Sequence, residues 1–92
     1  MGERYVIERR TYMDYVKIGD KGRHLKIPKG YKLVTDKSII ITKDNMKNFK
    51  VANLHQIFWM SVTKDDISDI YGNIFENFPA VEVGDYVIMK EK

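Results

Sequence analysis

The apolar positions between Lys64 and Phe78 recur at helical spacing. Large apolar side chains stand three or four residues apart in this segment, and the residues between them are polar or small. Thr63 precedes the segment as an N-cap, and Pro79 disfavours helical geometry at the residue before it. The pattern predicts an amphipathic helix over residues 64–78 that must pack against the rest of the chain. Its apolar face comprises Ile67, Ile70, Tyr71, Ile74, Phe75 and Phe78.

The first half of the chain has the β-branched and alternating pattern of short strands. Turn sequences divide it, namely Gly19–Gly22 with two glycines and Pro28–Gly30 with a proline followed by glycine. Three successive isoleucines, 39–41, predict a central strand that is covered on both faces. The predicted strands cover residues 5–8, 12–18, 24–27, 31–35 and 38–42.

The pattern is less regular after residue 42. Residues 43–54 fit neither template, so we expect one or two helical turns from Asp44 and then an irregular return. The bulky run within residues 55–62 predicts a buried strand with Trp59 in the core. Near the end, Gly84-Asp85 predicts a turn that leads into a final strand.

Together these elements predict an α+β fold in a single small domain, residues 1–92. We expect an antiparallel sheet of about five strands with the amphipathic helix 64–78 packed on one face. Ile70 and Phe75 then belong to the core, where truncation to alanine costs about 2–5 kcal/mol. A hydrophobic content of 43% is too high for a disordered chain.

The composition also bears on location. The sequence contains no cysteine, which suits a reducing compartment. Its longest apolar run, residues 57–60, is far too short to span a bilayer. We therefore expect a cytoplasmic protein without a membrane partner.

Charge is distributed unevenly along the chain. Residues 1–50 hold 13 Lys and Arg against 6 Asp and Glu, whereas residues 51–92 hold 3 against 7, and the net charge is +3. The stretch 21–32 has five basic residues and no acid, and aromatic rings lie beside them. Such a surface attracts phosphates, and its rings can stack on bases. The predicted nucleic-acid-binding residues are Lys21, Arg23, Lys26, Lys29, Tyr31 and Lys32.

Other interpretations of the same charges remain open. Charged residues ordinarily cover the solvated face of a sheet, and strand tyrosines commonly pack in the core. The tyrosines and the acidic face of the predicted helix could instead contact a protein partner, as in a small interaction module or a protein inhibitor. The basic half of one copy could also meet the acidic half of another, giving a homo-oligomer.

Patterns typical of catalysis are missing from the sequence. His24 and His55 are 31 residues apart, no serine has the context of a nucleophile elbow, and no glycine-rich segment ends as a P-loop does. We therefore predict no catalytic residue, no metal site and no cofactor. The sequence favours a small non-catalytic binding module that contacts nucleic acid, with the protein-binding module as the alternative.

Overall fold

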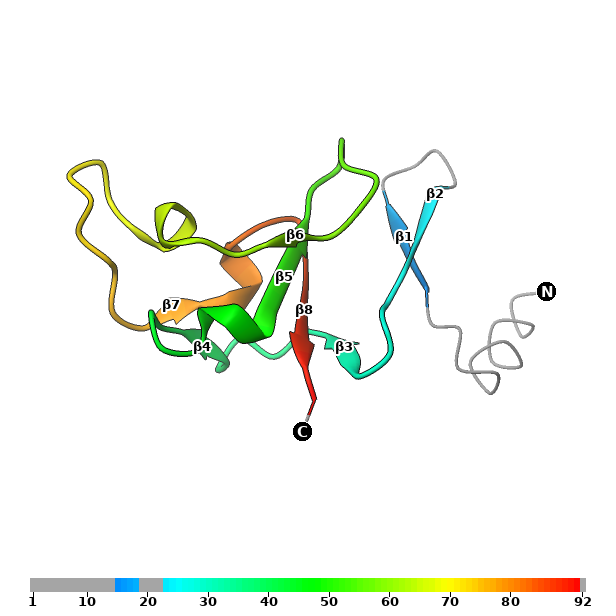
Figure 1. Ribbon diagram of the computed structural model, residues 1–92, viewed down its shortest axis with the longest axis horizontal. Coiled ribbons are helices and arrows are strands. Elements are labelled where there is room, and N and C mark those ends of the chain that lie inside the picture. The colour runs from blue at the N-terminus through cyan, green and yellow to red at the C-terminus, as the bar shows by residue number, and fades with distance from the viewer. Residues whose placement is uncertain (1–14, 19–22, 92) are drawn as a thin grey trace.

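Short strands and single 3-10 turns make up the regular structure of the residues that the structure describes. The computed structural model describes residues 15–18 and 23–91 (Figure 1). No helix among these residues is long and apolar enough to cross a membrane. The strands are β1 (Tyr15–Ile18), β2 (Arg23–Lys26), β3 (Tyr31–Leu33), β4 (Ile40–Ile41), β5 (Phe49–Ala52), β6 (Met60–Ser61), β7 (Phe78–Pro79) and β8 (Tyr86–Lys90), and the 3-10 turns are η1 (Met46–Asn48), η2 (Lys64–Ile67) and η3 (Ala80–Glu82).

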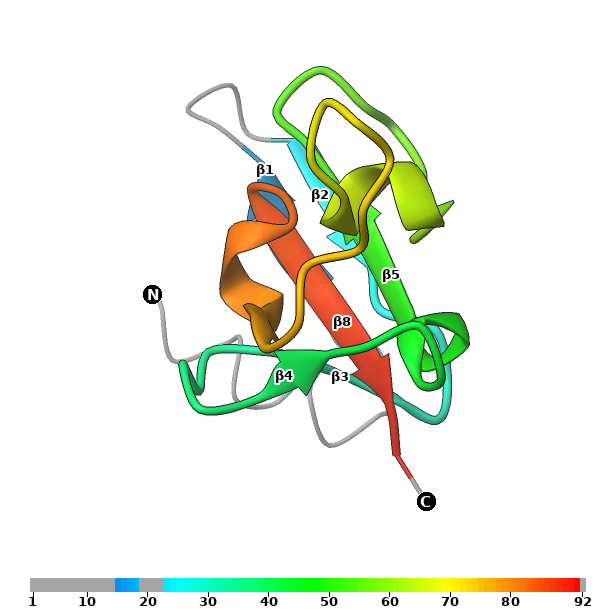
Figure 2. The ribbon, with the colours of Figure 1, turned by 90° about the vertical axis from the view of Figure 1, so that its left-hand side faces the viewer.

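An antiparallel sheet of four strands, in the order β3-β8-β5-β6, forms the centre of the described structure. The last strand, β8, therefore lies between β3 and β5, as Figures 1 and 2 show. Two smaller antiparallel pairs flank this sheet. The β1-β2 hairpin lies at one end of the described structure in Figure 1, and the β4-β7 pair lies on the other side of β8.

Two hydrophobic clusters pack on opposite faces of β8. Val87 belongs to the first cluster and Ile88 to the second, as expected for neighbours in a strand, whose side chains point to opposite faces. In the second cluster Val16 of the hairpin and Ile27 pack with Ile88. The buried members of the first cluster are Val34, Ile41, Phe49, Val51, Val62, Ile67, Ala80 and Val87.

The predicted helix over residues 64–78 is wrong, and with it the α+β assignment. The segment contains only the 3-10 turn η2, an isolated bridge between Ser68 and Ile74, and strand β7. Of the six residues assigned to the apolar face, Ile67 alone is fully buried. Ile70 and Tyr71 are 90% and 82% exposed, so they contribute almost nothing to the core.

Local hydrogen bonds explain why the helix does not form. The carboxylate of Asp69 accepts hydrogen bonds from the backbone amides of Tyr71 and Asn73, at 2.8 and 2.9 Å. Asp, Asn and Ser compete in this way with helical hydrogen bonds. Gly72 and Asn77 have φ values of 86° and 59°, which a right-handed helix does not accommodate.

The predicted sheet is also wrong in its membership. The three isoleucines are not a central strand, because only Ile40 and Ile41 are extended and they pair with β7. The segment expected to return irregularly contains β5, which packs Phe49, Val51 and Ala52 into the interior. Which segments join the sheet is decided by hydrogen bonds between strands that are distant in the sequence. The local pattern of apolar residues carries no information about these pairings.

Several local predictions are confirmed. The Pro28–Gly30 turn is closed by a 3.1 Å hydrogen bond from the Tyr31 amide to the Pro28 carbonyl, and Gly30 has the positive φ of 88° that a type II turn requires there. The final strand follows Gly84-Asp85. Strand 5–8 and the turn at Gly19–Gly22 lie outside the described residues.

Ile67 and Ile70 should differ sharply in their contribution to stability. Ile67→Ala removes a fully buried side chain and should lower the free energy of unfolding by about 2–5 kcal/mol, whereas Ile70→Ala should change it by less than about 0.5 kcal/mol. Urea denaturation of both variants measures the difference. Equal losses of unfolding free energy in the two variants would contradict the exposed position of Ile70 in a loop.

Gly84 should tolerate no side chain. A Cβ atom at this position would overlap Cγ2 of Val51 and lie 2.8 Å from Oδ1 of Asn53. Gly84→Ala should therefore cost about 1–3 kcal/mol or more through overpacking. Gly30→Ala is the control, because nothing lies within 4 Å of its Cβ and only the positive φ is strained. A larger loss of stability in Gly30→Ala than in Gly84→Ala would contradict this close approach.

Candidate nucleic-acid interface

The β1-β2 hairpin carries the clearest group of basic and aromatic side chains. Its register pairs Tyr15 with Lys26 and Lys17 with His24. These four residues alternate along both strands with the inward-facing Val16 and Leu25, so they share the other face. All four are exposed. We call Tyr15, Lys17, His24 and Lys26 the outer face of the hairpin.

Packing and one hydrogen bond hold this hairpin on the central sheet. Val16 is buried against Ile88, and Leu25 packs at the edge of the same cluster. From the loop before β6, the indole nitrogen of Trp59 donates a 2.9 Å hydrogen bond to the carbonyl oxygen of Lys26. Trp59 is half-buried rather than enclosed in the core. The outer face therefore belongs to a pair of strands that is fixed to the central sheet.

For two of the six predicted binding residues, the structure describes no side chain. Lys21 lies outside the described residues. Arg23 begins β2 and pairs with Ile18, but its side chain lies outside the described part of the structure. Lys26 stands on the outer face, and Lys29 is exposed in the turn that follows.

The other two predicted residues point to opposite faces of β3. Tyr31 is half-buried and packs against the second cluster, where the Lys50 ammonium lies 5.9 Å from its ring centroid. Such a contact contributes about 0.5–1 kcal/mol. Lys32 pairs with Met89 and borders an open groove of about 630 Å³ together with Asn48, Lys90 and Glu91. Tyr31 and Lys32 thus do not form one surface.

The six predicted binding residues include none from β1, although Tyr15 was considered as a base-stacking ring. Lys17 and His24 were left out of the predicted set, although both lie on the outer face with Lys26. The signal that would have found them is the pairing register of the two strands around Gly19–Gly22. That register brings residues on either side of a turn into one row.

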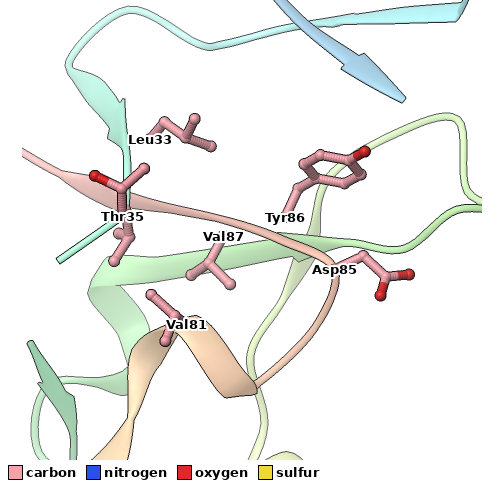
Figure 3. A pocket seen from close by; sticks show the side chains of 7 residues that line it. Leu33, Thr35, Val81, Asp85, Tyr86 and Val87 are labelled. Carbon is pink, nitrogen blue, oxygen red and sulfur yellow. The ribbon is translucent and has the colours of Figure 1, made fainter. Parts of the chain in front are cut away.

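The described residues also bear on whether the protein has a metal site or a ligand cavity. They have no group of three or more His, Cys, Asp or Glu side chains that could hold a metal ion. A cavity of about 260 Å³ between β3, η3 and β8 has mainly apolar walls. In Figure 3 the carboxylate of Asp85 points away from Leu33 and Val81, and it accepts a 3.0 Å hydrogen bond from the amide of Leu54. This carboxylate has a structural partner.

Comparisons of the chain with protein-family models, with curated proteins and with solved structures found no match.

Trp59→Phe should weaken the attachment of the hairpin to the central sheet without leaving a cavity beneath it. The substitution keeps an aromatic ring but removes the donor to Lys26, which should lower the free energy of unfolding by about 0.5–1.5 kcal/mol. Amide hydrogen exchange should accelerate in β1 and β2 more than in β5. Phe58→Leu, at a neighbouring side chain that is 58% exposed, is the control and should change neither. Unchanged exchange in the hairpin of Trp59→Phe would show that the hydrogen bond does not brace it.

Proposed function

We propose that the protein is a small, non-catalytic binding module that contacts nucleic acid through the outer face of the β1-β2 hairpin. The observation that carries the proposal is the register that groups Tyr15, Lys17, His24 and Lys26 on one exposed face. The two lysines supply charge for the phosphate backbone. An antiparallel ribbon of this kind has the width that the major groove of a duplex admits.

The aromatic residue on this face supports the same proposal. Tyr15 is 46% exposed, so part of its ring is open to a partner. A ring beside ammonium groups can stack on an unpaired base while the lysines hold the neighbouring phosphates. The hairpin therefore suits either a duplex groove or a single strand.

The sequence from the start of β2 to residue 35 is basic. Residues 23–35 include Arg23, Lys26, Lys29 and Lys32 but no Asp or Glu. Local positive charge of this kind raises the rate of encounter with a polyanion and makes binding sensitive to salt. We place such a module in the cytoplasm, in keeping with a sequence that has no cysteine.

Fluorescence anisotropy of labelled single-stranded and duplex DNA and RNA tests this proposal. Binding should weaken as salt rises. In the double variant Lys17→Ala/Lys26→Ala, the slope of log K against log salt should fall by about 2, about 1 for each phosphate-contacting lysine. Tyr15→Ala should weaken binding to single strands more than to duplexes.

The matched control is Lys37→Ala/Lys43→Ala, which removes two exposed lysines outside the hairpin. It has the same net charge as the hairpin variant but keeps the outer face. Equal losses in the two double variants would assign the binding to net charge alone and overturn the proposed face. Failure of the unmodified protein to bind any of the four nucleic acids at low salt would overturn the function itself.

A further inference from the structure

The loop between Ser68 and Ile74, which we call the tip loop, is closed by hydrogen bonds around Asp69. Beyond the two amide bonds to its carboxylate, Asp69 accepts a 3.0 Å hydrogen bond at its carbonyl from Gly72. Its own amide donates to the Asn73 carbonyl at 2.9 Å. The amide of Asn73, followed by that of Tyr71, lowers the pKa of Asp69 below its usual 3.8, so this carboxylate is charged at neutral pH. The stability that the charged carboxylate contributes is lost as the pH falls below 3.8 and through the lowered pKa of Asp69.

This hydrogen-bonded loop presents two large apolar side chains to solvent. Ile70 and Tyr71 are 90% and 82% exposed, the highest values among the exposed large hydrophobic residues of the described structure. A loop whose backbone is already held by hydrogen bonds loses less backbone freedom when a partner covers it. Exposed apolar groups on a fixed loop with a polar rim are typical of contact sites between proteins.

Acidic residues flank the tip loop on both sides in the sequence, and they outnumber the one basic residue there, Lys64. Asp65 and Asp66 precede the loop in η2 and Glu76 follows it, and all three are exposed. The amide of Phe75 donates to the Ile67 carbonyl at 2.8 Å, which brings the two sides of the loop together. A matching partner therefore offers positive charge around an aromatic or apolar centre.

The same chain carries a surface of that description. The outer face of the hairpin has Lys17 and Lys26 around the exposed ring of Tyr15. In Figure 1 the tip loop, in yellow, and the hairpin lie at opposite ends of the described structure along its longest axis. Figure 2 shows the tip loop in front with the hairpin behind it. Because the two lie at opposite ends, the tip loop does not contact the hairpin of its own copy.

We propose that the tip loop docks on the hairpin of a second copy of this chain, in a head-to-tail contact. Tyr71 then lies against the ammonium groups of Lys17 and Lys26, and Ile70 covers the ring of Tyr15. Two different surfaces meet in such a contact. The hairpin of one terminal copy and the tip loop of the other therefore stay free, and chains of copies grow. The contact is small and charged, and it weakens as salt rises.

This inference does not rest on the proposed function, although both use the outer face of the hairpin. The test contains no nucleic acid, so the two proposals fail independently. If both hold, an oligonucleotide should dissociate the assemblies because it competes for Lys17 and Lys26.

Sedimentation velocity with pairs of charge-reversed variants tests the contact. At low salt, the weight-average sedimentation coefficient of the unmodified protein should rise with concentration. The hairpin variant Lys17→Glu/Lys26→Glu and the tip variant Asp65→Lys/Glu76→Lys should each remain monomeric. An equimolar mixture of the two should assemble again, because every head-to-tail contact then joins opposite charges.

Two further variants separate the contact from folding and from net charge. Tyr71→Ala alters an exposed side chain, so it should leave the urea midpoint unchanged while weakening association about tenfold or more. Lys37→Glu/Lys43→Glu carries the same charge change as the hairpin variant and should still assemble. A monomer at all concentrations, no recovery on mixing, or growth that stops at a closed dimer would overturn the head-to-tail contact.

Discussion

Burial of β8 on both faces is the constraint on which the rest of the structure depends. Val87 points into the first hydrophobic cluster and Ile88 into the second, and each is at most 2% exposed. The strand also has hydrogen-bonded neighbours on both edges. The clusters therefore share one backbone, and Ile88 is the side chain through which the hairpin joins the sheet. That contact, together with the hydrogen bond from Trp59 to Lys26, holds the outer face of the hairpin in place.

The sequence predicted the local turns and the final strand, where a few neighbouring residues suffice. Gly30 and Pro28 determine a turn through their own backbone preferences. It failed at residues 64–78, where apolar spacing suggested a helix but Asp69, Gly72 and Asn77 favour tight turns. Helical periodicity describes where side chains would lie if the helix formed. It does not measure the competition from side chains that bond to the backbone.

The candidate site was predicted only in part for a related reason. Grouping Lys26 with Tyr31 and Lys32 followed their closeness in sequence, but alternation along β3 separates the last two. Lys17 and His24 join Lys26 through cross-strand register, which depends on which residues pair across Gly19–Gly22. The sequence showed that the two halves of the chain differ in charge, but it did not predict where these charges lie in space. The basic hairpin and the acidic tip loop lie at opposite ends of the described structure (Figure 1).

The most direct measurement of the central claim is an NMR titration of the isotope-labelled protein with unlabelled single-stranded and duplex oligonucleotides. It reports on every assigned backbone amide at once, so it compares the hairpin with the tip loop in one sample. The account predicts that the largest shifts fall on Tyr15, Lys17, His24 and Lys26, while the amides of Ile70 and Tyr71 stay unchanged when the protein is dilute. Shifts centred on the tip loop, or on Lys32 and its groove, would contradict it.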